Sequence, residues 1–109
     1  MIHKHYIDGK WVESGSGETF ESINPANGEV VGALSKAGPK EVDEAVEAAV
    51  RAFQHWRRVP APKRAEILFR AAEMLVKRKE ELAVSMTREM GKVLKEARGD
   101  VQEGIDMTY

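Results

Sequence analysis

Residues 29–56 read EVVGALSKAGPKEVDEAVEAAVRAFQHW, and within this stretch the spacing of apolar residues changes from two to about 3.6. Before the change, residues 29–34 are a short apolar run typical of a strand. After it, Pro39 stands where a first helical residue belongs, because its ring fixes a helical backbone angle and no N–H is needed there. The stretch therefore divides the chain into a strand-rich part, residues 1–37, and a helical part, residues 39–109.

The strand-rich part contains three turn signals. Asp8-Gly9 separates Tyr6-Ile7 from residues 10–12, which predicts a tight hairpin. Residues 14–17, Ser-Gly-Ser-Gly, are interpreted as a linker turn, and residues 19–23 alternate as a half-buried strand does. A third turn, residues 24–28, leads into the strand before Pro39. We therefore expect short antiparallel strands in this part.

The helical part is expected to form about four helices. Pro60 and Pro62 end the first and begin the second, Glu80-Glu81 begins the third, and Gly91 ends it. The first three carry apolar stripes at helical spacing, which predicts one buried face on each. These stripes are Val42, Ala45, Val46, Ala49, Phe53 and Trp56; then Ala65, Leu68, Phe69, Ala72, Leu75 and Val76; then Leu82, Met86 and Met90.

A fourth helical pattern runs from about Val93 through Leu94, Ala97, Val101 and Ile105. No stop signal follows it before Tyr109, which favours a chain truncated within its last helix. The alternative is a naturally short protein. The chain as a whole is thus predicted to be an α+β fragment.

Composition excludes several classes of function. Seventeen Lys and Arg side chains balance eighteen Asp and Glu, so no excess of positive charge attracts nucleic acid. No apolar run reaches the roughly 20 residues that span a bilayer, and the N-terminus lacks the apolar stretch of a secretory signal, so we expect a cytoplasmic protein without a membrane partner. The chain has no cysteine, which removes disulfides, thiolate ligands and a cysteine nucleophile.

Histidines and charged pairs were considered as sites of chemistry. His3 and His5 alternate on an expected strand and could share a metal ion, but without a third ligand they are interpreted as an adventitious pair. His55 has no partner spaced to make it a general base. Arg57-Arg58 is interpreted as a salt-bridged surface turn, and the acidic pairs Glu80-Glu81 and Glu96 with Asp100 as solvated helix faces. Composition, periodicity and spacing alone indicate no active site.

Four motifs in order nevertheless resemble the N-terminal stretch of the NAD(P)-dependent aldehyde dehydrogenase superfamily. They are YIDGKW at residues 6–11, INPANGEV at residues 23–30, Trp56 with Arg64, and EMGK at residues 89–92. None is specific alone, but their order and spacing extend over nearly the whole chain. The sequence departs from the pattern at Asn27, where Thr is common.

The resemblance implies an α/β parent with a Rossmann-type cofactor domain, of which residues 1–109 would be the N-terminal part. Such an enzyme oxidises an aldehyde to a carboxylic acid with NAD or NADP, through cysteine attack, hydride transfer and hydrolysis of a thioester. All these catalytic groups would lie beyond Tyr109, so the chain alone should be inactive. The parent would be a homodimer or homotetramer, and the apolar stripes would be covered by residues absent here.

The resemblance also implies two sites on residues that are present. A monovalent cation would be held by the Ile23 carbonyl and Glu89, and the alternative is that Glu89 caps or pairs at a helix end. Val101, Glu103 and Ile105 would border the substrate channel, with Glu103 holding a substrate ammonium; the alternative is a solvated Glu103. Two other functions stay open: a CoA-acylating semialdehyde dehydrogenase, and a self-standing helical interaction module.

Overall fold

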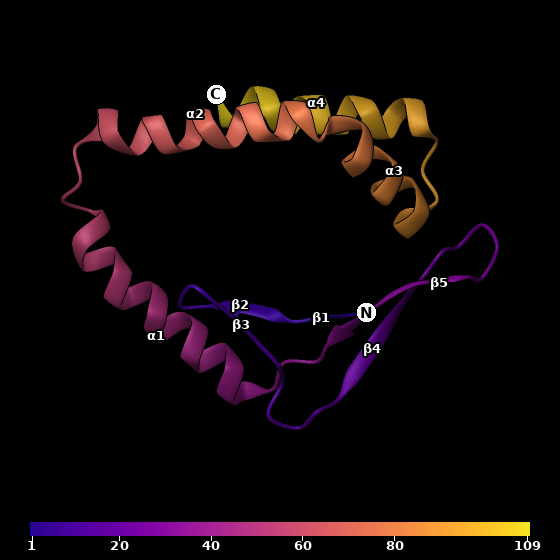
Figure 1. Ribbon diagram of the computed structural model, residues 1–109, viewed down its shortest axis with the longest axis horizontal. Coiled ribbons are helices and arrows are strands. Elements are labelled where there is room, and N and C mark those ends of the chain that lie inside the picture. The colour runs from indigo at the N-terminus through magenta and orange to yellow at the C-terminus, as the bar shows by residue number, and fades with distance from the viewer. The chain divides into compact units, whose positions relative to one another are not determined.

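A computed structural model describes residues 1–109, which divide into two compact units. Unit 1 comprises residues 1–23 and 30–58, and unit 2 comprises residues 24–29 and 59–109. Figure 1 shows their elements. Unit 1 contains β1 (Ile2–His3), β2 (His5–Ile7), β3 (Lys10–Val12), β4 (Thr19–Ile23), β5 (Val30–Ser35) and α1 (Pro39–Trp56); unit 2 contains α2 (Ala61–Lys77), α3 (Lys79–Met90) and α4 (Leu94–Thr108).

The predicted hairpin is confirmed as β2 and β3. Asp8 and Gly9 have φ values of 52° and 74°, and both angles lie in the left-handed region that a two-residue hairpin turn requires. Tyr6 pairs directly with Trp11, and their ring centroids lie 5.0 Å apart. Cross-strand aromatic pairs of this kind help to hold a short hairpin together.

The other three strands form a sheet in the order β1-β5-β4. β4 and β5 are antiparallel, as predicted, with Phe20 opposite Leu34. β1 was not predicted as a strand separate from the one expected to carry both His3 and His5, and it pairs with β5 in the parallel direction, Ile2 opposite Ala33. A two-residue strand is too short to show an alternating pattern, and its pairing is decided by contacts with a segment far along the chain.

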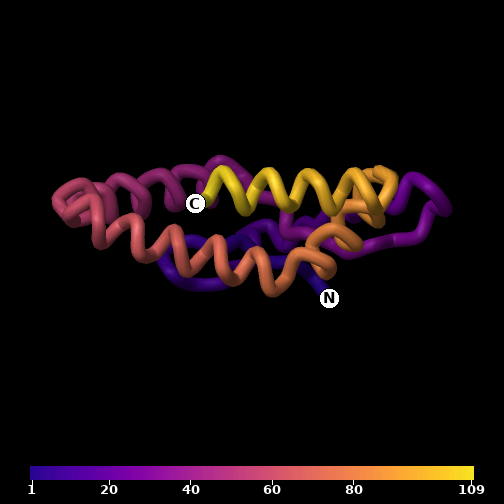
Figure 2. The backbone as a smooth tube through the Cα atoms, turned by 90° about the horizontal axis from the view of Figure 1, so that it is seen from above, coloured from indigo at the N-terminus to yellow at the C-terminus, as the bar shows by residue number.

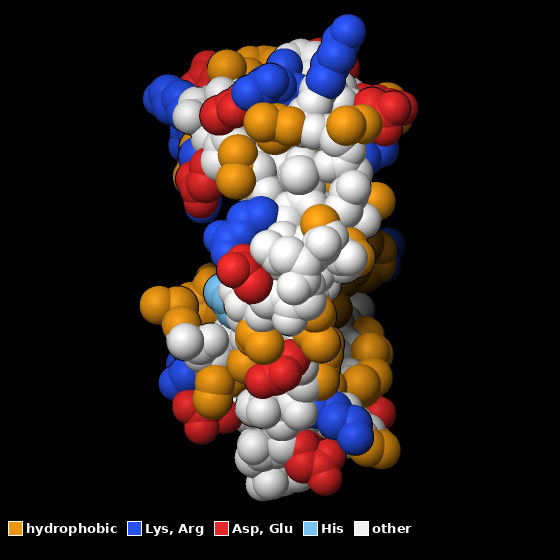
Figure 3. Space-filling model, turned by 90° about the vertical axis from the view of Figure 1, so that its right-hand side faces the viewer, with side chains coloured by type: hydrophobic (Ala, Val, Ile, Leu, Met, Phe, Trp, Pro, Cys, Tyr) orange, Lys and Arg blue, Asp and Glu red, His pale blue; other side chains and the backbone are white.

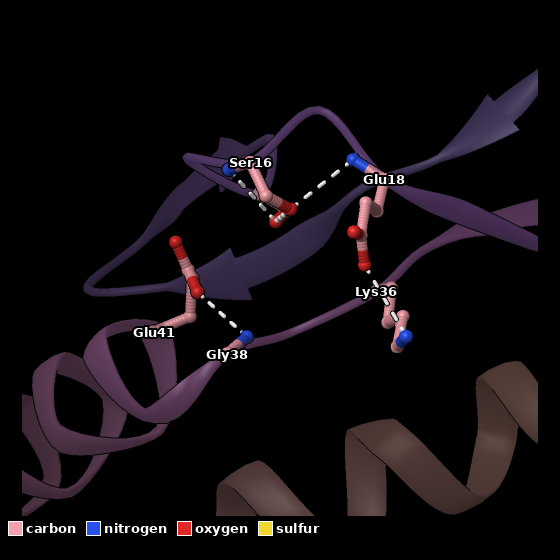
Figure 4. Close-up of polar contacts among 6 residues, drawn as sticks. Ser16, Glu18, Lys36, Gly38 and Glu41 are labelled. Carbon is pink, nitrogen blue, oxygen red and sulfur yellow. Dashed lines mark hydrogen bonds and ion pairs between the residues drawn. The ribbon is translucent and has the colours of Figure 1, made fainter.

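The start of α1 is held by a carboxylate that the sequence interpretation overlooked. Glu41 is only 7% exposed, and its two oxygens accept hydrogen bonds from the backbone N–H groups of Gly38 and Gly15, each at 2.8 Å. Figure 4 shows Glu41 turned back toward Gly38. The first bond satisfies a free N–H at the helix start, and the second ties the loop of residues 14–17 to α1. This loop is therefore an anchored turn.

The same loop carries its own polar contacts. The Ser16 hydroxyl accepts a hydrogen bond from the Glu18 N–H at 3.2 Å, and the Glu18 carboxylate pairs with the Lys36 ammonium at 3.2 Å (Figure 4). The end of the loop at Glu18 is thus connected to Lys36, the residue after β5. The ion pair is exposed and contributes little by itself.

Replacing Glu41 by Gln is expected to lower the melting temperature at neutral pH by about 4–8 °C. Two backbone hydrogen bonds, first from Gly15 and then from Gly38, hold the pKa of Glu41 below its ordinary value of 4.5. Because the folded pKa is lowered, the carboxylate stabilises the fold above pH 4.5 and loses this effect as pH falls through the folded value. The difference between the two proteins should therefore shrink on acidification.

Thermal melts followed by circular dichroism from neutral to acidic pH measure this effect. Glu47→Gln on the same helix is the matched control, because Glu47 is exposed and has no hydrogen bond to a backbone group. A Glu41→Gln deficit that stayed constant down to the lowest pH would show that the charge of Glu41 is not what stabilises α1.

The apolar stripe on α1 is exposed in this structure. Val42, Val46 and Phe53 are each more than half exposed, and so is Val50, which was not assigned to the stripe. The prediction of a buried face is thus wrong within unit 1, because β2 is the only strand that packs appreciably against α1. Figure 3, which views the side of the chain away from α1, also shows apolar side chains at the surface between charged ones. The exposure of apolar surface by the chain alone is as expected.

Unit 2 has the better-formed core. α4 packs against both α3 and α2, and α2 and α4 lie side by side in Figures 1 and 2. The fourth predicted helix is confirmed as α4, and its residues Ala97, Val101 and Ile105 are buried. The α2 stripe is buried only in part, because Leu68, Phe69 and Val76 are about half exposed, and Met90 is exposed at the end of α3, against prediction. The core consists of Ala83, Ala97, Val101 and Ile105, with Leu75, Leu82, Met86 and Leu94 packed around it.

Ion pairs connect the helices of unit 2 at the surface. Arg98 on α4 donates two hydrogen bonds to Glu80 on α3, at 2.8 and 2.6 Å, and these bonds lower the pKa of Glu80. Arg78 binds Glu81 in the same way. The interpretation of Glu80-Glu81 as a merely solvated face is therefore wrong. The Arg98 partner lies 18 residues away in the chain, too far for helical spacing to indicate it.

Candidate functional site

The three residues predicted to border a substrate channel divide between two faces of α4. Val101 and Ile105 are 9% and 1% exposed and belong to the core of unit 2, whereas Glu103 is exposed. Side chains two residues apart on a helix point in directions about 200° apart. Glu103 is two residues from both Val101 and Ile105, so it lies on a different face of α4. Val101 and Ile105 therefore pack inside unit 2, and a role for α4 beside a substrate depends on its other face.

Glu103 is part of a charged cluster around Lys92. The Lys92 ammonium binds the Asp100 carboxylate, which raises the pKa of Lys92, and the negative charges of Glu96 and Glu103 raise it further. Asp100 thus contacts the ammonium directly, whereas Glu96 and Glu103 act on it only through their charge. The cluster carries an excess of negative charge, which favours a cationic ligand over an anionic one. The interpretation of Asp100 as a solvated residue paired in sequence with Glu96 is wrong, because its partner is Lys92.

Glu89 lies in a shallow hollow along α3. The hollow has a volume of about 520 Å³ and is lined by Leu82, Ser85, Met86, Glu89 and Met90. Its walls are mostly apolar, with one carboxylate and one hydroxyl. Glu89 makes no hydrogen bond or ion pair within the chain, so its oxygens are available to a ligand. Ile23, its predicted partner in a cation site, belongs to unit 1 at the end of β4.

The two N-terminal histidines do not share a strand. His3 belongs to β1 and the three-stranded sheet, whereas His5 belongs to β2 and the hairpin. The prediction that both imidazoles lie on one face of a strand is therefore wrong, because the chain changes sheets at Lys4. No group of three or more His, Asp or Glu side chains is placed to hold a metal ion.

The basic turn after α1 also differs from its interpretation. The Arg57 guanidinium lies 5.8 Å from the centre of the Phe53 ring, and neither Arg57 nor Arg58 forms a salt bridge. A cation over an aromatic face is a common surface contact of arginine. The Arg57 side chain thus contacts Phe53, one helical turn back, and backbone hydrogen bonds to Phe53 and His55 close the turn.

Comparisons with known sequences and solved structures identify the protein family of this chain. A profile of the aldehyde dehydrogenase family matches residues 11–109, so the chain belongs to the aldehyde dehydrogenase family. Malonate-semialdehyde dehydrogenase 2 of Geobacillus kaustophilus is 50% identical over 103 residues, which are 94% of this chain and 21% of that protein. Malonate-semialdehyde dehydrogenase of Listeria monocytogenes is 47% identical over the same share.

Solved structures give the same family. HpcC of Thermus thermophilus superposes with a TM-score of 0.96 at 41% identity. The match covers 99% of this chain and 21% of the HpcC chain. Betaine aldehyde dehydrogenase of Staphylococcus aureus, solved with NAD⁺, superposes with a TM-score of 0.94 at 32% identity, over 97% of this chain and 22% of its own. The chain thus spans about a fifth of the relatives that it matches. None of its helices has the length and apolar character needed to cross a membrane.

Proposed function

We propose that residues 1–109 form the N-terminal part of the cofactor-binding domain of an enzyme that oxidises an aldehyde to a carboxylic acid with NAD or NADP. The family match over residues 11–109 carries this proposal. Structural neighbours include an NAD-dependent aldehyde dehydrogenase of Sinorhizobium meliloti and an NADP-dependent enzyme of E. coli, which supports a nicotinamide cofactor without deciding between the two.

The reaction requires groups that these 109 residues do not contain. A cysteine thiolate attacks the aldehyde carbon, hydride passes to the nicotinamide, and a glutamate assists water in hydrolysing the thioester. The chain has no cysteine, so its nucleophile must come from further residues. The present residues act as structural scaffold. The core of unit 2 holds α3 and α4 together, and Glu41 fixes the start of α1.

The test is an assay of the longer protein that contains this chain. With an aldehyde and NAD or NADP it should form the reduced cofactor and the free acid, whereas the 109-residue chain should form neither. Addition of CoA distinguishes the acylating alternative, because an acyl-CoA product would then replace the acid. Turnover by the 109-residue chain itself would refute the assignment of catalysis to other residues.

We propose a semialdehyde that carries a carboxylate as the substrate class. Several relatives at 43–50% identity are malonate-semialdehyde dehydrogenases, and this is the observation that supports it. A second class, an aldehyde that carries an amino group, is favoured by the three negative charges, Glu103 among them, that act on Lys92. The two classes differ in charge, so a single substitution on α4 can separate them.

Glu103→Gln in the longer protein provides this separation. If Glu103 holds a substrate ammonium, the KM for an amino aldehyde should rise by about tenfold or more, because a charge-assisted hydrogen bond is lost, while kcat changes little. If the substrate is a carboxylate, removal of a negative charge should leave KM unchanged or lower it. Lys95→Gln, an exposed change elsewhere on α4, is the control. An unchanged KM for both classes would exclude Glu103 from the substrate site.

We further propose that Glu89 and the Ile23 carbonyl hold a monovalent cation in the longer enzyme. Hard oxygen ligands suit such an ion, and Glu89 has no competing partner in the chain. A crystal of the longer protein grown with a heavier monovalent ion should show a strong anomalous peak beside Glu89. A crystal without that peak would exclude the site. A crystal of the Glu89→Gln protein, which should lack the peak, is the matched negative control.

We infer a cytoplasmic homodimer or homotetramer for the longer enzyme, in which further residues cover the exposed apolar stripe of α1. The half-exposed Val46 and Phe53 support this covering. The alternative of an independent helical interaction module is distinguished by the coding sequence: a stop codon directly after Tyr109 favours the module, and continuation into a cysteine-containing domain excludes it.

A further inference from the structure

The turn of residues 24–28 exposes an asparagine next to a glycine. Asn27 is exposed and is followed by Gly28, whose φ is +77°. No atom lies within 4 Å of the position where a Cβ of Gly28 would stand. The backbone nitrogen of Gly28 is therefore free of the side-chain crowding that normally keeps a following residue away from an asparagine side chain.

We propose that Asn27 is a site of spontaneous deamidation. The Gly28 nitrogen attacks the Asn27 Cγ, and the new C–N bond closes a five-membered imide ring. The side-chain nitrogen leaves as ammonia, taking up the proton that the Gly28 nitrogen loses. Water then adds to one of the two ring carbonyls and opens the ring, which leaves an aspartate or, if the other C–N bond breaks, an isoaspartate. Water is the only co-reactant.

Hydrogen bonds within the turn act on both reacting groups. The Asn27 Oδ1 accepts a hydrogen bond from the Glu29 N–H at 3.0 Å, and this donor would also stabilise the negative charge that develops on Oδ1 during attack. The Gly28 N–H donates to the Asn24 carbonyl at 2.8 Å, which opposes loss of its proton. The first bond activates the electrophile and the second restrains the nucleophile, so unfolding should raise the rate.

The chain provides its own internal control. Its only other asparagine, Asn24, precedes Pro25, and a proline nitrogen has no proton to lose and cannot close the imide. Asn24 lies three residues away in the same turn and experiences the same solvent, pH and temperature. A difference between the two therefore reports the neighbouring residue rather than the conditions.

The product would change the turn. Either form adds a negative charge next to Glu29, and isoaspartate also adds a methylene to the main chain between β4 and β5. The Asn27 hydrogen bond with the Glu29 N–H depends on the present backbone path, so this bond should be lost in the isoaspartate form. The modification would thus loosen residues 24–29 without breaking the chain.

The experiment incubates the 109-residue chain at mildly alkaline pH, with and without urea, and follows the tryptic peptide of residues 11–36 by mass spectrometry. Fragmentation should locate the mass gain from NH₂ to OH at Asn27, at a rate at least about tenfold above that of Asn24, because only Asn27 is followed by a residue with a backbone N–H. Released ammonia should match the modified fraction, and the rate should be higher in urea.

Two variants test the chemistry. Asn27→Thr should abolish the mass gain in this peptide. Gly28→Ala should slow the reaction in urea. The unfolded chain does not impose a positive φ at residue 28, so the two proteins then differ only in the crowding of the nucleophilic nitrogen by the alanine side chain. No gain at Asn27 in the folded chain, an equal gain at Asn24, or a Gly28→Ala rate in urea equal to that of the parent would each overturn the proposal.

Discussion

In a chain that carries Ile105→Ala, the free energy of unfolding of unit 2 is expected to fall by about 2–5 kcal/mol. Ile105 is the largest fully buried side chain and is 1% exposed. Its core neighbours include Ala83 and Ala97, and alanine side chains have no rotamers with which to fill the cavity. Small domains have only about 5–15 kcal/mol of stability in total, so this loss should make unit 2 marginal.

Urea unfolding followed by far-ultraviolet circular dichroism measures this loss. Met107→Ala on the same helix is the matched control, because Met107 is 82% exposed and its replacement should change stability by less than about 0.5 kcal/mol. If Ile105→Ala fails to fold, Ile105→Val should still give a readable loss of about 0.5–1.5 kcal/mol. Equal unfolding midpoints for the Ile105 and Met107 variants would contradict the assignment of Ile105 to the core.

Replacing Gly91 by Ala is expected to cost about 2–4 kcal/mol, as the sum of a left-handed backbone and an overpacked contact. Gly91 ends α3 with φ 75°, a conformation that side chains disfavour. A Cβ added there would also lie 2.8 Å from the Pro25 Cγ, closer than real contacts allow. The glycine therefore both ends the helix and lets the turn of residues 24–29 pack against it.

A double-mutant cycle separates these two costs. Pro25→Ala removes the clashing Cγ, so the Gly91→Ala penalty should shrink in that background to the backbone part alone. Gly99→Ala in the interior of α4 is the control, because nothing lies within 4 Å of its added Cβ and alanine should stabilise a helix by about 0.5–1 kcal/mol there. An unchanged penalty in the Pro25→Ala background would show that Gly91 and Pro25 do not touch.

Much of the secondary structure could be predicted because its signals are local. Asp8-Gly9 specified the hairpin turn, Pro39 the start of α1, and Gly91 the end of α3, and the structure confirms all three. Each signal depends on backbone angles that only certain residues adopt easily, so the residue type alone carries the information. No such signal marks the break at Lys4 between β1 and β2, and the separate strand β1 was missed.

The candidate site was harder to predict. Helical spacing indicates which residues share a face of a helix, but it does not indicate what packs against that face. Val101 and Ile105 share one face, and the structure places it against the core of unit 2. Glu103 lies on another face, with its charge near Lys92. On α1 the same kind of stripe is exposed. Periodicity could not distinguish a face buried within the chain from one left for other residues.

The sequence by itself determined the order of strands and helices, their main boundaries and, through four spaced motifs, the aldehyde dehydrogenase family. Only the tertiary structure decided what the charged and apolar side chains do. Glu41 meets Gly15 across 26 residues, and Arg98 meets Glu80 across 18. Backbone preferences act over a few residues and can be read locally, whereas burial and ion pairing depend on segments that meet only when the chain folds.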